Sequence, residues 1–447
     1  MKDKQTFYRE MLFIAFPAML QNLIVSSLNT LDTMMISTLG SSAIAGVGLA
    51  NQVFFLFICI CFGINTGSSV LIAQYWGKRD IKNVQRVNAI ASTLSLILGV
   101  VFTLAAALFP TQIIRLMIED PTVIRDGANY LRMVSFSYVL TGLGASFGTS
   151  LRSTGNPRTP LAASLLSFVT NAFFNYVLIF GALGFPKLGI AGVALGTVIA
   201  RFAELMLIVY VLKTYSGPLN APIRDAMSFD KPFLSKYYQV MLPVVVNETF
   251  WSIGQVLYSV AYALAGRDAT AAVQIAVAVQ NIAFVAVRGL GSSCTIMIGN
   301  QIGQENYDNV HAYAKEFVRL SFISGLVLGA FMSLTPQVSL LMFGDLTPKV
   351  YEYTVMLLRV MGPIFVAKSM NSIIVVGVLR GGGDTKFSMV MEMFAVWAIG
   401  VPLAFLGAAV LKLPIYYIVG LAGMEEIFKG IVGIFRIRSN KWINQLT

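Results

Sequence analysis

Charged residues are scarce in this chain. They make up 12% of its 447 residues, whereas a soluble domain usually has about 25%. Hydrophobic residues make up 56%, and the mean hydropathy is +0.74. A soluble globular protein is therefore excluded, and a polytopic membrane protein is predicted. The apolar runs are too long and continuous for the strands of a membrane barrel, so we predict an all-α membrane protein.

Cysteine and histidine are almost absent. Of the three cysteines, Cys59 and Cys61 form the one close pair, and side chains two residues apart diverge on a helix. They are predicted to be packing residues rather than metal ligands. The single histidine, His311, falls in a polar loop, and no nucleophile with a neighbouring base is apparent. These absences argue against an enzyme and against a bound cofactor.

The apolar residues fall into twelve spans, separated by turns rich in glycine, proline and charge. A helix needs about 20 apolar residues to cross a membrane, so each span is long enough for one crossing. The predicted spans are residues 11–38, 43–76, 88–109, 127–150, 158–181, 189–213, 236–263, 268–303, 313–334, 349–378, 386–410 and 414–436.

The basic residues are divided unevenly between the two sides of the predicted membrane. Most lie in segments on the same side as both chain ends, including the loops that contain Arg152 and Arg380. Lysine and arginine gather on the cytoplasmic side, so both termini are predicted to be cytoplasmic, in a plasma (inner) membrane. The net charge of +11 is explained by this topology. Nucleic acid is therefore not a predicted partner.

The two halves of the chain repeat. Pro17 and Pro243 lie 226 residues apart, and so do Gly40 and Gly266. Six spans in each half give a parallel repeat about an axis along the membrane normal, which is one design of alternating-access transporters. The predicted domains are an N-terminal lobe at residues 1–213 (spans 1–6), a cytoplasmic linker at 214–236 and a C-terminal lobe at 237–447 (spans 7–12).

One acid interrupts the first two spans. Asp32 is the single charged residue between Glu10 and Lys78. An ionised carboxylate in hydrocarbon costs at least about 3 kcal/mol by insertion scales, so its side chain must face protein, water or a cation, or carry a proton. We predict that Asp32 is the functional centre. The alternative is a buried acid that hydroxyl groups satisfy for packing alone.

Three polar residues lie at the same predicted depth as Asp32. They are Asn171 and Asn175 in the fifth span and Thr197 in the sixth. The two asparagines share a helix face because they are four residues apart. A carboxylate, two amide oxygens and a hydroxyl suit a hard cation such as Na⁺, or a proton on Asp32. Packing between helices is the alternative for the asparagines and the threonine.

The second half has intramembrane charges of its own. A cross-helix pair between Glu248 and either Arg288 or Lys368 is predicted, because an unpaired charge is costly there. Either such a pair is a static bridge that fixes helix packing, or its carboxylate exchanges a proton or drug during transport. Aromatic residues on the seventh span either line a substrate site or serve as packing. The candidate C-terminal cluster consists of Glu248, Arg288, Lys368, Glu392, Trp251 and Tyr258.

Several motifs resemble those of the multidrug and toxic compound extrusion (MATE) family, over essentially the whole chain. The motifs are Pro17 followed by Asp32 in Leu31-Asp32-Thr33-Met34-Met35; Gly77-Lys78; Gly155-Asn156-Pro157; Asn171-Ala172-Phe173-Phe174-Asn175; and Gly192-Val193-Ala194-Leu195-Gly196-Thr197.

The resemblance implies twelve helices in two pseudo-symmetric six-helix lobes around a central cleft. It also implies export of lipophilic, mostly cationic compounds in exchange for Na⁺ or H⁺. Asp32, Asn171, Asn175 and Thr197 match the family's coupling residues, and Pro17 matches a proline that bends the first helix in some members. Small-molecule drugs and membrane lipids are then the expected partners, and the chain is expected to be a monomer.

The chain departs from some members at Asn175, where they carry a second carboxylate. This difference argues against a two-acid proton relay and favours Na⁺, while H⁺ stays open. An alternative within the same superfamily is a flippase for lipid-linked oligosaccharides, which the cations Arg288 and Lys368 would suit. A channel or receptor-like membrane protein is an alternative of another class, and the six-plus-six repeat argues against it.

Overall fold

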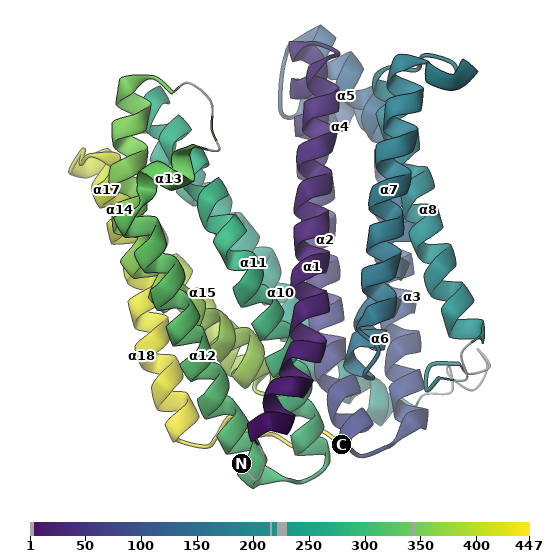
Figure 1. Cartoon of the computed structure of the whole chain (residues 1–447), viewed down its shortest axis with the longest axis vertical. Helices are drawn as coiled ribbons and strands as arrows, with labels where there is room; N and C mark the ends of the chain where they lie inside the picture. The colour runs from purple at the N-terminus through teal and green to yellow at the C-terminus, as the bar shows by residue number, and fades with distance from the viewer. Residues whose placement is uncertain (1–3, 215–216, 221–229, 342, 344–345) are drawn as a thin grey trace. The chain divides into compact units, whose positions relative to one another are not determined.

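The computed structural model describes residues 4–214, 217–220, 230–341, 343 and 346–447. The predicted linker, residues 214–236, lies partly outside this described part. The described chain is built from helices with no named strand, and Figure 1 shows the long helices of each half as bundles. The predicted all-α class is confirmed.

The chain forms two compact units. The N-terminal unit comprises Leu20–Met241, and the C-terminal unit comprises Met1–Met19 and Leu242–Thr447. Two helices are therefore divided between them: α1 (Lys4–Ser37) and α10 (Lys231–Ala263). Both contain an internal proline close to the division, Pro17 in α1 and Pro243 in α10. The beginning of each half thus belongs to the compact unit of the other half.

The remaining helices follow the order of the predicted spans. The N-terminal unit contains α2 (Ser41–Gly77), α3 (Ile81–Leu108), α4 (Pro110–Arg115), α5 (Pro121–Val134), α6 (Phe136–Ser153), α7 (Arg158–Phe180), the 3₁₀ turn η1 (Ala182–Gly184) and α8 (Ile190–Thr214). The C-terminal unit contains α11 (Arg267–Gly303), α12 (Tyr307–Leu334), α13 (Pro336–Leu340), α14 (Pro348–Ser372), η2 (Ile373–Arg380), α15 (Thr385–Phe394), η3 (Ala395–Gly400), α16 (Val401–Phe405), η4 (Leu406–Val410), α17 (Ile415–Ala422) and α18 (Met424–Arg438). The segments η2, η3 and η4 are π-helical.

Ten helices of the described part are long and apolar enough to cross a membrane. The other two predicted spans are interrupted. The span at 127–150 is divided between α5 and α6 at Ser135, and the span at 414–436 between α17 and α18 at Gly423. The count of twelve crossings therefore stays a prediction.

The repeat read from the sequence is present in the helices themselves. Helices α2 and α11 each have 37 residues, and α3 and α12 each have 28, with starting points 226 residues apart. The residues that cap α2 and α11 are Gly40 and Gly266, whose φ angles are 107° and 102°. Both positions require glycine, because such φ values are costly for residues with a side chain. The internal repeat is confirmed.

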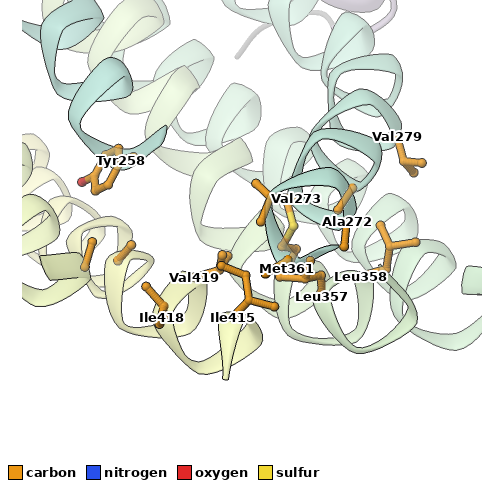
Figure 2. Packing of buried hydrophobic residues seen from close by; sticks show 14 of the residues in the cluster. Tyr258, Ala272, Val273, Val279, Leu357, Leu358, Met361, Ile415, Ile418 and Val419 are labelled. Atoms are coloured by element: carbon orange, nitrogen blue, oxygen red, sulfur yellow. The ribbon is translucent and has the colours of Figure 1, made fainter. Parts of the chain in front are cut away.

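Each unit has its own apolar core. In the C-terminal unit, Figure 2 shows Leu358 and Met361 of α14 beside Ala272 and Val273 of α11, with Ile418 of α17 in the same cluster. Small residues let the helices approach closely, which drives association in lipid.

Glycines set the contact between α12 and α14. A side chain at Gly362 would come within 2.4 Å of the carbonyl oxygen of Gly329. Only glycine therefore fits at this crossing.

Candidate functional site

The four residues predicted to couple transport to a cation lie together in the N-terminal unit. Asp32 comes from α1, Asn171 and Asn175 from α7, and Thr197 from α8. The side-chain amide of Asn175 donates to Asp32 Oδ1 at 2.6 Å and to Asn171 Oδ1 at 3.0 Å. The amide of Asn171 donates in turn to Thr197 Oγ1 at 3.3 Å. We call these four residues the Asp32 cluster.

The Asp32 cluster is largely buried, so its polar groups need hydrogen-bond partners or a ligand. Asn171 and Asn175 are fully buried, and Asp32 is half-buried. Among the side-chain hydrogen bonds described, one reaches the Asp32 carboxylate, and its donor is the Asn175 amide. This bond stabilises the ionised form of Asp32. The Oδ1 atom of Asn175 is buried and has no hydrogen-bond partner in the described part of the chain. A buried acceptor without a partner costs about 1–3 kcal/mol, a cost that a bound ligand would remove.

The donor set fits a hard cation. Na⁺ and similar ions take oxygen ligands such as carboxylates, amide carbonyls and hydroxyls. The Asp32 cluster offers all three kinds. It also fits a proton, since a protonated Asp32 would need an acceptor and the Asn175 oxygen is available.

Gly196, which belongs to a quoted motif but had no predicted role of its own, positions the Asp32 cluster. A side chain at Gly196 of α8 would lie 2.1 Å from Asn175 Oδ1, and one at Gly192 would lie 2.8 Å from the backbone of Leu178. Helices α7 and α8 therefore pack along Gly192 and Gly196, which are spaced as in small-xxx-small contacts. The four-residue spacing of the two glycines could have predicted this close contact from the sequence, because small residues at that spacing let two helices approach each other.

A second polar network lies in the same unit. Arg201 and Glu204, three residues apart on α8, form a local ion pair at 2.7 Å. Ser164 Oγ donates to Glu204 at 3.4 Å and accepts from Gln21 Nε2 at 2.9 Å. Arg152 donates to Gln21 Oε1 at 2.7 Å. Arg201 also interacts electrostatically with Asp32, so this network adjoins the Asp32 cluster through its charge.

The predicted pairing of Glu248 with Arg288 or Lys368 is wrong. Glu248 instead pairs with Arg380 at 2.7 Å, and Arg380 also contacts Glu392 at 3.0 Å. Asn247 donates a further hydrogen bond to Glu392.

Arg380 is 1% exposed and ends the π-helical segment η2. The prediction that Arg380 lies in a cytoplasmic loop is therefore wrong about its burial. The apolar run just before it was the signal for burial.

Tyr258 belongs to another buried charge cluster. Its hydroxyl donates to Glu425 at 2.7 Å, and Lys429 lies 3.3 Å from both Glu425 and Glu426. Asn371 donates to Glu426 at 2.8 Å. The tyrosine is therefore a buried hydrogen-bond donor, not simply part of an aromatic face.

The other predicted residues of the C-terminal cluster form no ion pair or hydrogen bond with Glu248 among those described. Trp251 is half-buried and packs against the core shown in Figure 2. Lys368 donates to Gln280 Oε1 at 2.7 Å, and Arg288 lies over the ring of Phe284. The predicted cluster is thus divided among several separate arrangements.

Pro17 lies inside α1, whose helix continues through it to Ser37. The bend predicted at this proline stays a prediction. Pro17 is two residues from Met19, the last residue of α1 in the C-terminal unit. Asp32 lies on the part of α1 that belongs to the N-terminal unit.

These features define a polytopic helical membrane protein built on an internal duplication, with a buried acid in its first half. The chain matches the sequence model of the MatE family over residues 17–177 and 243–406, once in each half. It belongs to the MatE family.

Curated relatives and solved structures are similar over nearly the whole chain. The probable multidrug resistance protein YoeA of Bacillus subtilis is 29% identical over 418 residues, covering 93% of this chain and 90% of that protein. The probable multidrug resistance protein NorM of Thermotoga maritima is 25% identical over 446 residues, covering 97% and 93%. An outward-facing multidrug resistance MATE transporter of the MOP superfamily shares the fold, with a TM-score of 0.87 at 21% identity over 97% of this chain and 96% of that one.

The family supports a membrane transporter of the multidrug efflux kind, and its members are transporters rather than enzymes. The match to MATE structures also supports the predicted two-lobed architecture.

Proposed function

We propose that this protein exports lipophilic, mostly cationic drugs in exchange for inward-moving Na⁺ or H⁺, with Asp32 as the coupling residue. The observation that carries the proposal is the hydrogen bond between Asp32 and Asn175 inside a buried set of oxygen donors. Similarity to proteins named as multidrug resistance proteins supports drug export.

The coupling cation and the Asn175 amide compete for one carboxylate. Without a cation, the N–H of Asn175 offsets the charge of Asp32. When Na⁺ binds, the carboxylate, Asn171 Oδ1 and Thr197 Oγ1 become its ligands, and rotation of the Asn175 amide presents Oδ1. When a proton binds, the Asp32 hydroxyl donates to the same Oδ1. Both events remove the hydrogen bond that joins α1 to α7.

Exchange of cation and drug requires that the two favour different states of the transporter. Asp32 and Pro17 lie on the same helix, so a change at the Asp32 cluster bears on α1 as a whole. We propose that α1 bends at Pro17 when the cation binds and that this lowers the affinity for drug. Release of drug outward and of the cation inward completes an alternating-access cycle.

The donor set favours Na⁺ over H⁺, because an amide replaces the second carboxylate that a two-acid relay would use. We further propose a monomer in the plasma membrane with both termini on the cytoplasmic side, as the basic residues indicate. Labelling of single cysteines at the two chain ends in intact cells tests the orientation. Labelling by a membrane-impermeant reagent would contradict it.

Transport assays test the coupling. Purified protein in proteoliposomes is given ethidium inside, and Na⁺ and H⁺ gradients are imposed separately. One of the two gradients is expected to drive ethidium efflux in the wild type and to fail with Asp32→Asn. Glu119→Gln, a change of an exposed acid, is the matched control and should leave efflux unchanged. Normal gradient-driven efflux by Asp32→Asn would remove Asp32 from the coupling step.

A further inference from the structure

Two basic side chains of the C-terminal unit lie near each other in the interior of long apolar helices. They are Arg288 of α11 and Lys368 of α14, and their charges interact. Arg288 is 15 residues from Gly303, the last residue of α11, or about 22 Å along the helix axis. At that depth a side chain that faces lipid is costly. The guanidinium must therefore face protein or a water-filled space.

Neither cation has an acidic partner within salt-bridge distance among the described residues. The buried acids whose charges reach Lys368 are Glu425 and Glu426. Both are already held by Lys429 at 3.3 Å. Glu248 and Glu392 are held by Arg380. The buried acids Glu316 and Asp384 are held by Arg319 and Arg436, respectively. Arg288 and Lys368 thus form a positively charged site, and no carboxylate among the described residues pairs with either of them.

An aromatic ring joins the two cations. The centroid of Phe284 lies 5.6 Å from the Arg288 guanidinium carbon and 5.7 Å from Lys368 Nζ. Gln280, Phe284 and Arg288 are spaced by four residues each and so share one face of α11. Gln280 Oε1 accepts a hydrogen bond from Lys368 at 2.7 Å, which fixes the ammonium group beside that face.

The arrangement is open to a ligand. Arg288 is exposed, and Phe284 and Lys368 are half-buried. An arginine fork binds a carboxylate through two hydrogen bonds, the lysine adds a second charge, and the phenyl ring offers a face for an aromatic group. Each of these three features selects for the same kind of molecule.

We infer that Arg288, Lys368 and Phe284 form a binding site for amphipathic aromatic anions, in which a carboxylate lies against the two cations and its ring against Phe284. The inference rests on the proposed drug export and names one substrate class: aromatic carboxylates, including zwitterions that also carry an amine. Purely cationic drugs do not use this site.

Binding of norfloxacin, an aromatic carboxylate, tests the site. Its affinity for the purified protein in nanodiscs is compared with that of norfloxacin methyl ester and of ethidium. Arg288→Met and Lys368→Met are each expected to weaken norfloxacin binding about tenfold, as for loss of a charged hydrogen bond, and to leave the ester and ethidium unchanged. Arg359→Met, an exposed cation on the same helix as Lys368, is the matched control and should alter none of the three.

Several results would overturn the inference. Wild-type norfloxacin affinity in both methionine variants is one of them, and an equal loss for all three compounds is another. Arg288→Lys keeps the charge but loses the fork, so it should restore part of the affinity, which separates a binding role from damage to the fold. Arg288 is suited to this comparison because it forms no ion pair among the described residues and lies over the ring of Phe284.

An anionic lipid headgroup is the rival ligand. Phosphatidylglycerol added to the nanodiscs should leave norfloxacin affinity unchanged. If it displaces norfloxacin from the wild type but not from Arg288→Met, the place is a lipid site and the inference fails. Failure of the proposed function gives a different result: neither norfloxacin nor ethidium is expelled by a cation gradient, whatever the charge at residues 288 and 368.

Discussion

Replacing Gly196 with alanine is expected to disable the Asp32 cluster without touching any of its side chains directly. The added methyl group would lie 2.1 Å from Asn175 Oδ1, whereas ordinary contact begins at 3.4 Å. A flip of the amide gives no relief, because its nitrogen would take the place of the oxygen. Either the amide moves by about 1.3 Å or α8 moves and takes Thr197 with it.

The size of the effect follows from the contact that is lost. A shift of that size is enough to break the 2.6 Å hydrogen bond between Asn175 and Asp32. A hydrogen bond to a charged group is worth about 1.5–3 kcal/mol, and a ligand oxygen for the cation is displaced at the same time. We therefore expect the cation concentration for half-maximal ethidium efflux to rise about 10- to 100-fold.

The assay is ethidium efflux from proteoliposomes at graded cation concentrations. Gly144→Ala is the benign control, since no atom lies within 4 Å of a side chain added there. The double variant with Gly196→Ala and Asn175→Ser should recover part of the cation affinity, because serine keeps an oxygen and shortens the side chain. A Gly196→Ala protein with the wild-type cation dependence would refute the positioning role of Gly196.

Other residues give further predictions. Arg380→Met should lower the free energy of unfolding by about 3–5 kcal/mol, because it leaves two glutamates unpaired in the interior; thermal unfolding in detergent measures this, and a Tm within a degree of the wild type would contradict it. Tyr258→Phe removes the hydrogen bond to Glu425 and should lower the free energy of unfolding by about 1–3 kcal/mol. The affinity for the cation should not change, because Tyr258 is not part of the Asp32 cluster. Asp120, which lies before α5 outside the predicted spans, has a pKa below its usual value because of hydrogen bonds from the side chain and backbone of Thr122. Its contribution to stability is therefore present above its unfolded-state pKa and is lost as the pH falls; a chain with Asp120→Ala should show a smaller loss of Tm between pH 6 and about pH 3.

The parts of the fold that follow from composition and period could be predicted. Long apolar runs can be satisfied only as helices in a membrane, and the spacing of Pro17 and Pro243 revealed the duplication. Asp32 could also be found, since one carboxylate in two apolar spans must have a partner. Its partners followed from depth, because residues at equal distance from the membrane surface can meet.

The pairing of charges in the C-terminal unit could not be predicted in the same way. Arg380 is next to three glycines and was interpreted as part of a loop, yet π-helical η2 carries it into the interior. Lys429 lies near the end of the last predicted span, yet it is 3% exposed and holds two glutamates. Charge counts along a chain identify neither the end of a helix nor the direction of a side chain. The passage of α1 and α10 from one compact unit to the other is marked in the local sequence by Pro17 and Pro243, but a proline does not show which unit each part of the helix joins.

The most direct test of the coupling site is uptake of the cation driven by drug. Proteoliposomes are loaded with ethidium so that it flows outward. Entry of radioactive sodium is measured, and acidification of the vesicle interior is measured separately with an internal pH-sensitive dye. The wild type should take up one of the two cations, and Asp32→Asn should take up neither while the same amount of protein is inserted in the membrane. Cation uptake by Asp32→Asn at the wild-type rate would contradict the account.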